Sequence, residues 1–208
     1  MGSSLTQLIK SGKVDQFNRR VREWEEEKGE LPTLSAETFE ELEVSGFDFS
    51  GIDLSYAEFA DCTLTDVRFD GANLNGAYFH GSTLIECYFE ESDLEMLAVD
   101  SSTFSKCHLR GVAFDNVEIT DCQFTECEFG EIESEGPILE RTTFTEGSWE
   151  GVEFREGQLK LVTLRSISLS EVDLSSCEAK NCYVTAGTTA GVELPDGFIE
   201  KTGRRRRL

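Results

Sequence analysis

The sequence predicts an all-β solenoid, a coil that turns a corner every five residues. First, every fifth residue from Phe49 to Val184 is large and apolar, except at Ser134 and Ala179. Second, the residue two places before each of these is small or apolar, and no charge occupies either position although 29% of the chain is charged. Neither a helix of 3.6 residues per turn nor a strand of period two keeps every fifth side chain on the same face.

Correlations at twenty residues predict four sides in each coil. One register holds threonine at five of six positions, interrupted only by Gln123. Its members are Thr63, Thr83, Thr103, Thr143 and Thr163. Stacking at the ~4.8 Å spacing of paired strands would turn residues 44–186 into about seven coils and a rod of roughly 34 Å.

The repeat unit resembles the pentapeptide-repeat family, as in Cys62-Thr63-Leu64-Thr65-Asp66 and Ala72-Asn73-Leu74-Asn75-Gly76. The resemblance covers residues 44–186. It implies a right-handed quadrilateral β-helix. Some members of the family are DNA mimics that bind type II topoisomerases and counter gyrase poisons, so the resemblance also implies a protein partner.

Residues 1–43 are expected to form an N-terminal helical cap. Val14, Phe17, Val21 and Trp24 recur at helical spacing, and Gly29 is a plausible helix stop. Such a cap would cover the open edge of the solenoid and prevent end-to-end polymerisation. A docking helix for a partner is the alternative interpretation of the same stripe.

Residues 187–208 are expected to form a C-terminal cap and a basic tail. The segment around Phe198 resembles those that close other members of the family, and Phe198 is expected to plug this end. The tail, Arg204 to Arg207, has three interpretations: a nucleic-acid contact, a fold back onto the acidic rod, or a frayed solvated terminus.

One stretch inside the repeat is expected to be irregular. Pro137 cannot donate a ladder hydrogen bond, which predicts a bulge or a loop at residues 131–138. The core is expected to narrow near Ser134, Pro137 and Gly147.

The sequence offers little for catalysis, so we expect a protein that is not an enzyme and needs no metal or cofactor. Cys87, Cys107 and Cys127 fall in one inward column, where buried reduced thiols are the first expectation and a disulfide the alternative. His80 and His108 fall on outward positions. No phosphate-binding loop, nucleophile elbow or zinc-protease motif is present.

Acidic residues dominate the outward positions. The chain has 41 acids and 19 bases, a net charge of −22, which disfavours direct binding to nucleic acid or an anionic membrane. We call the side of the coil that carries Leu54 the Leu54 side. Between residues 44 and 186 it has nine acids and one base, Arg155. These acids are Asp53, Asp93, Glu95, Asp115, Glu133, Glu135, Glu153, Glu156 and Asp173. They are the expected partner-binding residues.

The leading hypothesis is a DNA mimic that binds DNA gyrase or topoisomerase IV and protects it from topoisomerase-poisoning antibiotics. The alternative is a scaffold or regulatory module for an unrelated protein. A third hypothesis is ice binding through the threonine column. A homodimer is compatible with each. The first residues lack the basic and apolar segments of a secretory signal, so we expect a cytoplasmic protein.

Overall fold

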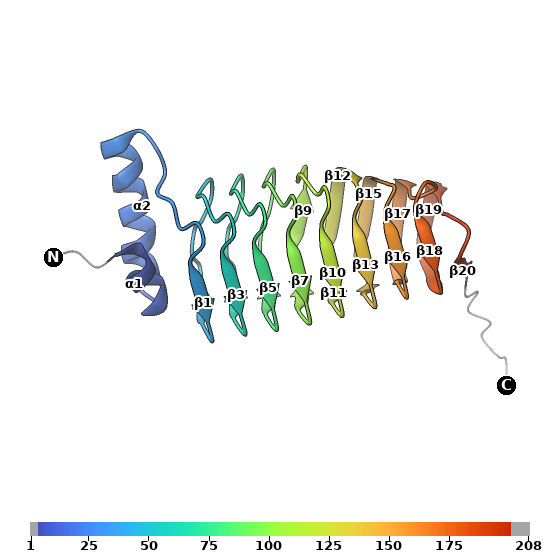
Figure 1. The fold of residues 1–208 in the computed structure, drawn as a ribbon, viewed down its shortest axis with the longest axis horizontal. Coiled ribbons are helices and arrows are strands. Elements are labelled where there is room, and N and C mark those ends of the chain that lie inside the picture. Colours follow the sequence, from blue (N-terminus) through green and yellow to red (C-terminus); the bar gives the residue numbers. More distant parts are fainter. Residues whose placement is uncertain (1–3, 201–208) are drawn as a thin grey trace.

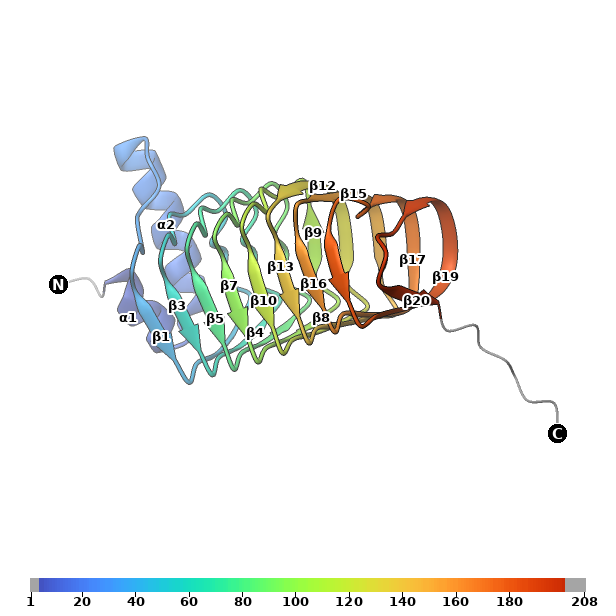
Figure 2. The same ribbon diagram turned by 45° about the vertical axis from the view of Figure 1, so that its right-hand side comes forward.

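The protein is a parallel β-solenoid of about eight turns with helices at its N-terminal end. The computed structural model describes residues 4–200, and for residues 186–189 the backbone alone. The coils stack side by side along one axis, from β1 beside the helices to β20 at the opposite end (Figure 1). The view in Figure 2 shows the strands of successive coils aligned into continuous walls. The solenoid expected from the sequence is confirmed.

The first wall, here the Phe59 side, is a parallel sheet of three-residue strands. Within the described residues its order is β1-β3-β5-β7-β10-β13-β16-β18. The bounds are β1 Thr38–Glu40, β3 Glu58–Ala60, β5 Tyr78–His80, β7 Ala98–Asp100, β10 Glu118–Thr120, β13 Ile138–Glu140, β16 Gln158–Lys160 and β18 Glu178–Lys180. In β3, β5 and β7 the central residue is buried and its two neighbours are half-buried, as expected when alternate side chains face opposite ways.

The second wall, here the threonine side, follows the first around each corner. Its strands pair in the order β2-β4-β6-β8-β11-β14-β17, and β19 then pairs with β17. The bounds are β2 Glu43–Ser45, β4 Thr63–Thr65, β6 Thr83–Ile85, β8 Thr103–Ser105, β11 Gln123–Thr125, β14 Thr143–Thr145, β17 Thr163–Asp173 and β19 Cys182–Glu193. The threonine register expected from the sequence is therefore a column on this wall.

The remaining two walls, here the Phe69 side and the Leu54 side, change character along the rod. In the early coils they are held by isolated parallel bridges, such as Arg68↔Tyr88 and Asp53↔Asn73. Later they become longer strands, β9 His108–Arg110, β12 Glu128–Glu135 and β15 Ser148–Arg155. Strands β12 and β15 each run along both walls, and β20, Phe198–Glu200, ends the described chain.

The pairing register is twenty residues throughout the stack from β1 to β18. Phe59 pairs with Phe79, Leu64 with Leu84 and Phe129 with Trp149. A local shift occurs where β17 pairs with β19, between Arg165 and Leu169. Four sides in each coil are therefore confirmed.

Nearly every corner between two sides in the described residues is made by one residue in the left-handed region. These residues follow the inward apolar residue by two places, and their φ values run from 49° at Arg141 to 72° at Gly46. Glycine adopts this conformation without strain, yet many corners carry other residues, for example Glu86 at 54° and Lys106 at 55°. The regular placement of this residue explains why the chain bends every fifth residue.

Aromatic rings stack inside the rod and change walls along it. Phe59 and Phe79 stack with centroids 4.7 Å apart on the Phe59 side. Farther along, Phe104 and Phe124 stack at 4.6 Å on the threonine side. An internal cavity of about 10 Å³, lined in part by Phe79 and Phe104, lies where the stacks change walls.

The predicted irregularity at residues 131–138 is wrong. Strand β12 pairs with β15 in an unshifted register up to Glu135, and Gly136 then forms an ordinary left-handed corner before β13 begins at Ile138. Other residues of the Pro137 column, such as Ala57 and Ala77, donate their N–H groups to Leu54 and Leu74 within their own coil. A proline in this column therefore removes no hydrogen bond between coils.

The space beside the small residue Ser134 is filled by side chains of the neighbouring coils. Phe114 and Phe154, from the coils on either side, approach each other to 5.9 Å between ring centroids. The Ser134 hydroxyl donates to the Phe114 carbonyl at 2.6 Å. Trp149, which is fully buried, lies beside Gly147. Large neighbours thus occupy the volume that the small residues leave.

The N-terminal end is covered by two helices, α1 Leu5–Lys10 and α2 Val14–Lys28. The sequence predicts α2 and its end at Gly29, which adopts a φ of 70°. Phe17 of α2 is fully buried, with ring centroids 5.3 Å from Phe47 and 5.2 Å from Phe49. This contact closes the apolar end of the rod, as the cap interpretation requires. Helix α1 was not anticipated from the sequence.

The first coil begins earlier than the expected boundary between residues 43 and 44. Thr33 already pairs with Asp53, and β1 and β2 lie before or across that boundary. The five-residue phase holds back to Leu34 and Phe39, which are buried, so about eight turns form where about seven were expected.

The C-terminal end is less completely covered. Phe198 is half-buried and packs against the core, and a cavity of about 330 Å³ lies beside it. The cavity is lined by Leu169, Val184, Val192, Leu194, Pro195, Phe198 and Glu200. Phe198 thus covers the end in part. The tail, Arg204 to Arg207, lies outside the described residues.

Candidate protein-binding surface

The nine acids predicted from the sequence lie on the Leu54 side or at its corner. Asp53, Asp93 and Asp173 belong to the column immediately before the inward residues, and Glu95 and Glu135 to the column immediately after them. Each of the nine is exposed or half-exposed. The solenoid therefore gathers carboxylates that are up to 120 residues apart in the sequence onto one wall.

Some of these aspartates also hold their own corner of the coil. The Ser55 N–H donates to Asp53 Oδ1 at 3.0 Å, and the Glu95 N–H donates to Asp93 Oδ1 at 3.0 Å. Asn73 accepts the equivalent bond from the Asn75 N–H at 3.0 Å. Because an amide serves as well as a carboxylate here, the backbone contact does not require the negative charge.

Two carboxylates of this wall, Asp53 and Asp173, are held in their ionised form by hydrogen bonds. Partial burial acts to raise the pKa of Asp53, but hydrogen bonds from Ser55 and Thr33 outweigh it and hold this pKa below its ordinary value. Bonds from Ser175 lower the pKa of Asp173 in the same way.

One base, Arg155, neutralises part of the negative charge of the Leu54 side locally. Arg155 Nε donates to Glu153 Oε1 at 2.6 Å, and its guanidinium lies 3.8 Å from Glu133 Oε2. Both contacts are on the solvent-exposed surface, where such pairs contribute little to stability. The wall therefore keeps a large net negative charge.

The neighbouring Phe69 side is a second acidic wall that the sequence reasoning did not single out. Between residues 44 and 186 it carries eight acids and two bases, Arg68 and Arg110. The acids are Asp48, Asp70, Glu90, Glu91, Glu128, Glu131, Glu150 and Glu171. Counting charges at twenty-residue spacing for all four walls, instead of for two, would have found it.

The two acidic walls share a corner, so together they form one half of the rod, here called the acidic half. It carries a net charge of −14 of the −20 present between residues 44 and 186. Spread over a rod of ~34 Å, this is one charge per ~2.4 Å, against one per ~1.7 Å for duplex DNA. The acidic half thus approaches the charge density of DNA, and it does so on one face.

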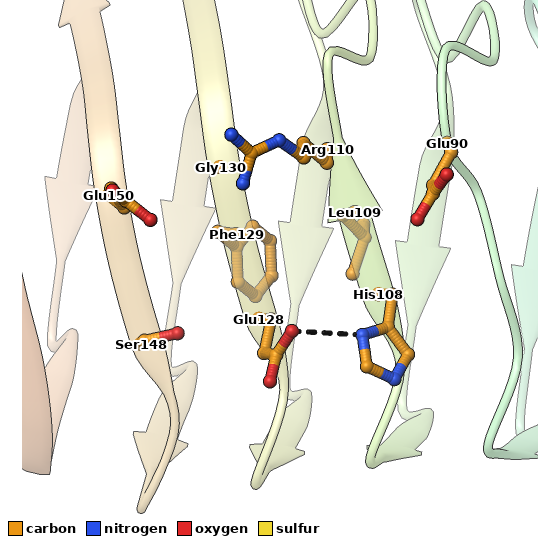
Figure 3. A pocket seen from close by; sticks show the side chains of 9 residues that line it. All are labelled: Glu90, His108, Leu109, Arg110, Glu128, Phe129, Gly130, Ser148 and Glu150. Atoms are coloured by element: carbon orange, nitrogen blue, oxygen red, sulfur yellow. Dashed lines mark hydrogen bonds and ion pairs between the residues drawn. The ribbon is translucent and has the colours of Figure 1, made fainter.

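A shallow hollow of about 70 Å³ interrupts the Phe69 side at Gly130 (Figure 3). Arg110 extends across Gly130, where a Cβ atom would lie 3.4 Å from Arg110 Cγ. The Arg110 guanidinium binds the carboxylate of Glu131. Glu90 and Glu150 line the hollow on either side. Arg110 therefore supplies the positive charge in the hollow, whose acids belong to the acidic half.

The histidine near this hollow is engaged with its neighbours in the column. His108 Nδ1 lies 3.0 Å from Glu128 Oε2, and its ring stacks on Tyr88 with centroids 5.0 Å apart. His80 pairs similarly with Asp100 at 3.1 Å. Both histidines point outward, as predicted, and both contact carboxylates of the next coil.

The seven cysteines are free thiols buried in the core, which confirms the first expectation for them. Burial raises the pKa of Cys122 to about 11. The pKa of Cys107 is raised chiefly by its hydrogen bonds with the thiols of Cys127 and Cys87. Among residues 4–200, no group of three or more histidines, cysteines or acids is arranged to hold a metal ion. Neither helix in this range is long and apolar enough to span a lipid bilayer.

Comparisons with known proteins agree with the repeat. A family model described as a pentapeptide repeat region matches residues 32–99. No curated protein matches the chain. Among solved structures, full-length QnrB1, a plasmid-mediated fluoroquinolone resistance protein, is 19% identical, with 82% of this chain and 92% of that chain covered and a TM-score of 0.49.

Two cyanobacterial pentapeptide-repeat proteins also match. Rfr23 from Cyanothece 51142 is 12% identical, with 51% of this chain and 94% of that chain covered and a TM-score of 0.38. HetL from Nostoc sp. strain PCC 7120, involved in heterocyst differentiation regulation, is 15% identical, with 86% and 92% covered and a TM-score of 0.24. The family model matches the first coils, and the same five-residue phase continues from there to Val184.

Proposed function

We propose that the protein is a non-catalytic, cytoplasmic DNA mimic that binds a type II topoisomerase, DNA gyrase or topoisomerase IV, through the Leu54 side. The acidic half carries this proposal, because its charge is dense, lies on one face and follows a straight axis. A protein groove that binds DNA is lined with lysine and arginine, and such a groove attracts a rod of this kind for the same electrostatic reason. In the presence of topoisomerase-poisoning antibiotics, occupation of the DNA groove would protect the enzyme.

Direct competition tests the proposal. Labelled duplex DNA is bound to gyrase, the protein is titrated in, and release of the duplex is followed by fluorescence anisotropy. We expect the protein to displace the duplex, and its affinity to fall as salt rises because the attraction is screened. Binding that duplex DNA does not displace would instead support the alternative function, a scaffold for a site unrelated to DNA.

Two matched charge variants locate the binding wall. The first neutralises four residues of the Leu54 side, Asp93→Asn, Glu95→Gln, Glu133→Gln and Glu135→Gln. The control neutralises four acids at the corners after the threonine side, Asp66→Asn, Glu86→Gln, Glu126→Gln and Glu146→Gln. Both change the net charge by the same amount.

We expect the first variant to lose affinity by at least about tenfold at low salt, while the control loses much less. The fold should survive in both, because the substituted side chains are exposed or half-exposed, and Asn73 already makes with its amide the contact that Asp93 makes with its carboxylate. Equal losses in the two variants would contradict the assignment to the Leu54 side. Far-ultraviolet circular dichroism checks that both remain folded.

A further inference from the structure

Two large apolar side chains lie exposed in one corner column that borders the Leu54 side. Tyr56 is 63% exposed and Met96 is 51% exposed. They occupy equivalent corner positions two coils apart, with Gly76 at the corner of the coil between them. Tyrosine and methionine are residue types enriched where proteins bind one another.

Tyr56 and Met96 both have a backbone conformation that is unfavourable for residues with large side chains. Tyr56 has a φ of 58° and Met96 a φ of 55°, in the left-handed region that glycine adopts without strain. Most of the other residues at these corners are glycine or polar side chains. Strain and exposure both act against stability, so folding does not account for a tyrosine and a methionine here.

Gly76 allows the two side chains to act together. A Cβ atom at Gly76 would lie 2.6 Å from Cε1 and 2.8 Å from Cδ1 of Tyr56. The tyrosine ring therefore extends over the coil of Gly76, in the direction of Met96. Any larger residue at position 76 would meet this ring. The result is an apolar ridge, made by Tyr56 and Met96, that crosses three coils.

Acids flank the ridge. Asp93 and Glu95 precede Met96 on its coil, and Asp53 and Glu58 lie on either side of Tyr56. All four are half-exposed. A purely basic partner would satisfy these acids but would leave the apolar side chains unmatched.

We propose that the Tyr56–Met96 ridge inserts into an apolar pocket of a protein partner, and that lysines and arginines edge this pocket. Charge complementarity requires lysines and arginines at the edge of the partner's pocket, because the acids that flank the ridge need bases opposite them. The exposed apolar surface requires the pocket, which would supply the part of the affinity that salt does not screen. This inference rests on the proposed function in taking the partner to be a protein, and it states what that partner must offer besides positive charge.

Glycine substitutions test the ridge without endangering the fold. The variant is Tyr56→Gly with Met96→Gly, and the control is Leu161→Gly. Leu161 is also an exposed corner residue, 40% exposed with a φ of 57°, but it lies on the corner between the Phe59 side and the threonine side. Glycine removes backbone strain at all three positions, so thermal unfolding should show each variant folded, and a loss of binding then reports the ridge.

The first probe is an amphipathic helical peptide of leucine and lysine, compared with an oligolysine of equal charge, by titration at 0.1 M and at about 0.5 M KCl. At the higher salt we expect the unchanged protein and Leu161→Gly to bind the amphipathic peptide about tenfold more tightly than oligolysine. The double variant should lose this preference. If the double variant retains it, the proposal is overturned.

The second probe is DNA gyrase, titrated with the same three proteins. If gyrase does not bind the unchanged protein, the proposed function fails, and the peptide comparison still decides the ridge. If gyrase binds and the double variant keeps its full affinity at high salt, the ridge proposal fails while the proposed function stands. If the double variant loses affinity for gyrase at high salt while Leu161→Gly does not, both the ridge proposal and the proposed function are supported.

Discussion

Replacing Gly147 by alanine tests how closely the coils approach inside the rod. A Cβ atom at this position would lie 2.1 Å from the Cys127 carbonyl oxygen and 3.0 Å from its nitrogen. Both atoms are backbone atoms of the neighbouring coil and cannot move aside as a side chain would. The coils must therefore separate locally.

The expected cost follows from the contacts on either side. Overpacking of this kind costs roughly 1–3 kcal/mol. Separation also weakens the bonds from Ser148 N to Cys127 O and from Ser168 N to Gly147 O, which are 3.0 and 2.9 Å long, at about 1 kcal/mol each. A total of about 3–5 kcal/mol lowers the melting temperature of a chain of this size by roughly 6–20 °C.

Two other glycines serve as controls in thermal unfolding followed by circular dichroism. Gly71→Ala meets no atom within 4 Å but has a φ of 63°, so it isolates backbone strain of about 1 kcal/mol. Gly130→Ala has ordinary backbone and meets the flexible Arg110 side chain at 3.4 Å, so it should be nearly neutral. If Gly147→Ala melts within a degree or two of Gly130→Ala, the close approach to Cys127 is wrong.

Three further predictions concern strain, thiols and pH. Lys106→Gly should stabilise the protein by about 0.5–1 kcal/mol by removing left-handed strain at a φ of 55°, whereas Lys106→Ala should not; thermal unfolding measures both. The native thiols should resist a disulfide reagent at pH 8, because all seven are buried and burial also raises the pKa of Cys122 to about 11. All seven should react once guanidinium unfolds the chain, and rapid reaction of the native protein would contradict this. Folding lowers the pKa of Asp173 from 3.8, so its ionised form stabilises the fold above that pH, and this contribution is lost as the pH falls through the lowered value. The Asp173→Ala variant should therefore have a lower melting temperature than the parent protein at pH 7. The difference between the two melting temperatures should vanish in acid.

The sequence predicted the architecture well because one period controls it. The inward residues recur with a phase of five, and the threonine register recurs with a phase of twenty, so both the core and the number of sides could be inferred. The nine acids were placed on one wall for the same reason. The end of α2 followed from the glycine at position 29.

What the sequence did not predict depends on particular neighbours. Nothing at Ser134 itself indicates that Phe114 and Phe154 would close over it, because that depends on ring orientation in two other coils. Pro137 suggested a distortion only because the partner of the missing N–H could not be known in advance. The ridge of Tyr56 and Met96 could not be predicted from the sequence, because the outward position of these residues does not indicate a left-handed backbone.

The constant register of twenty gives the molecule an unusual response to changes in length. Removing one whole turn would shorten the rod by ~4.8 Å and leave every later residue on its original wall. Removing a single five-residue unit would preserve the alternation of inward and outward positions, but everything after it would be rotated by a quarter turn. The carboxylates of the second half would then face away from those of the first, so the chain could still fold while its charged surface was split in two.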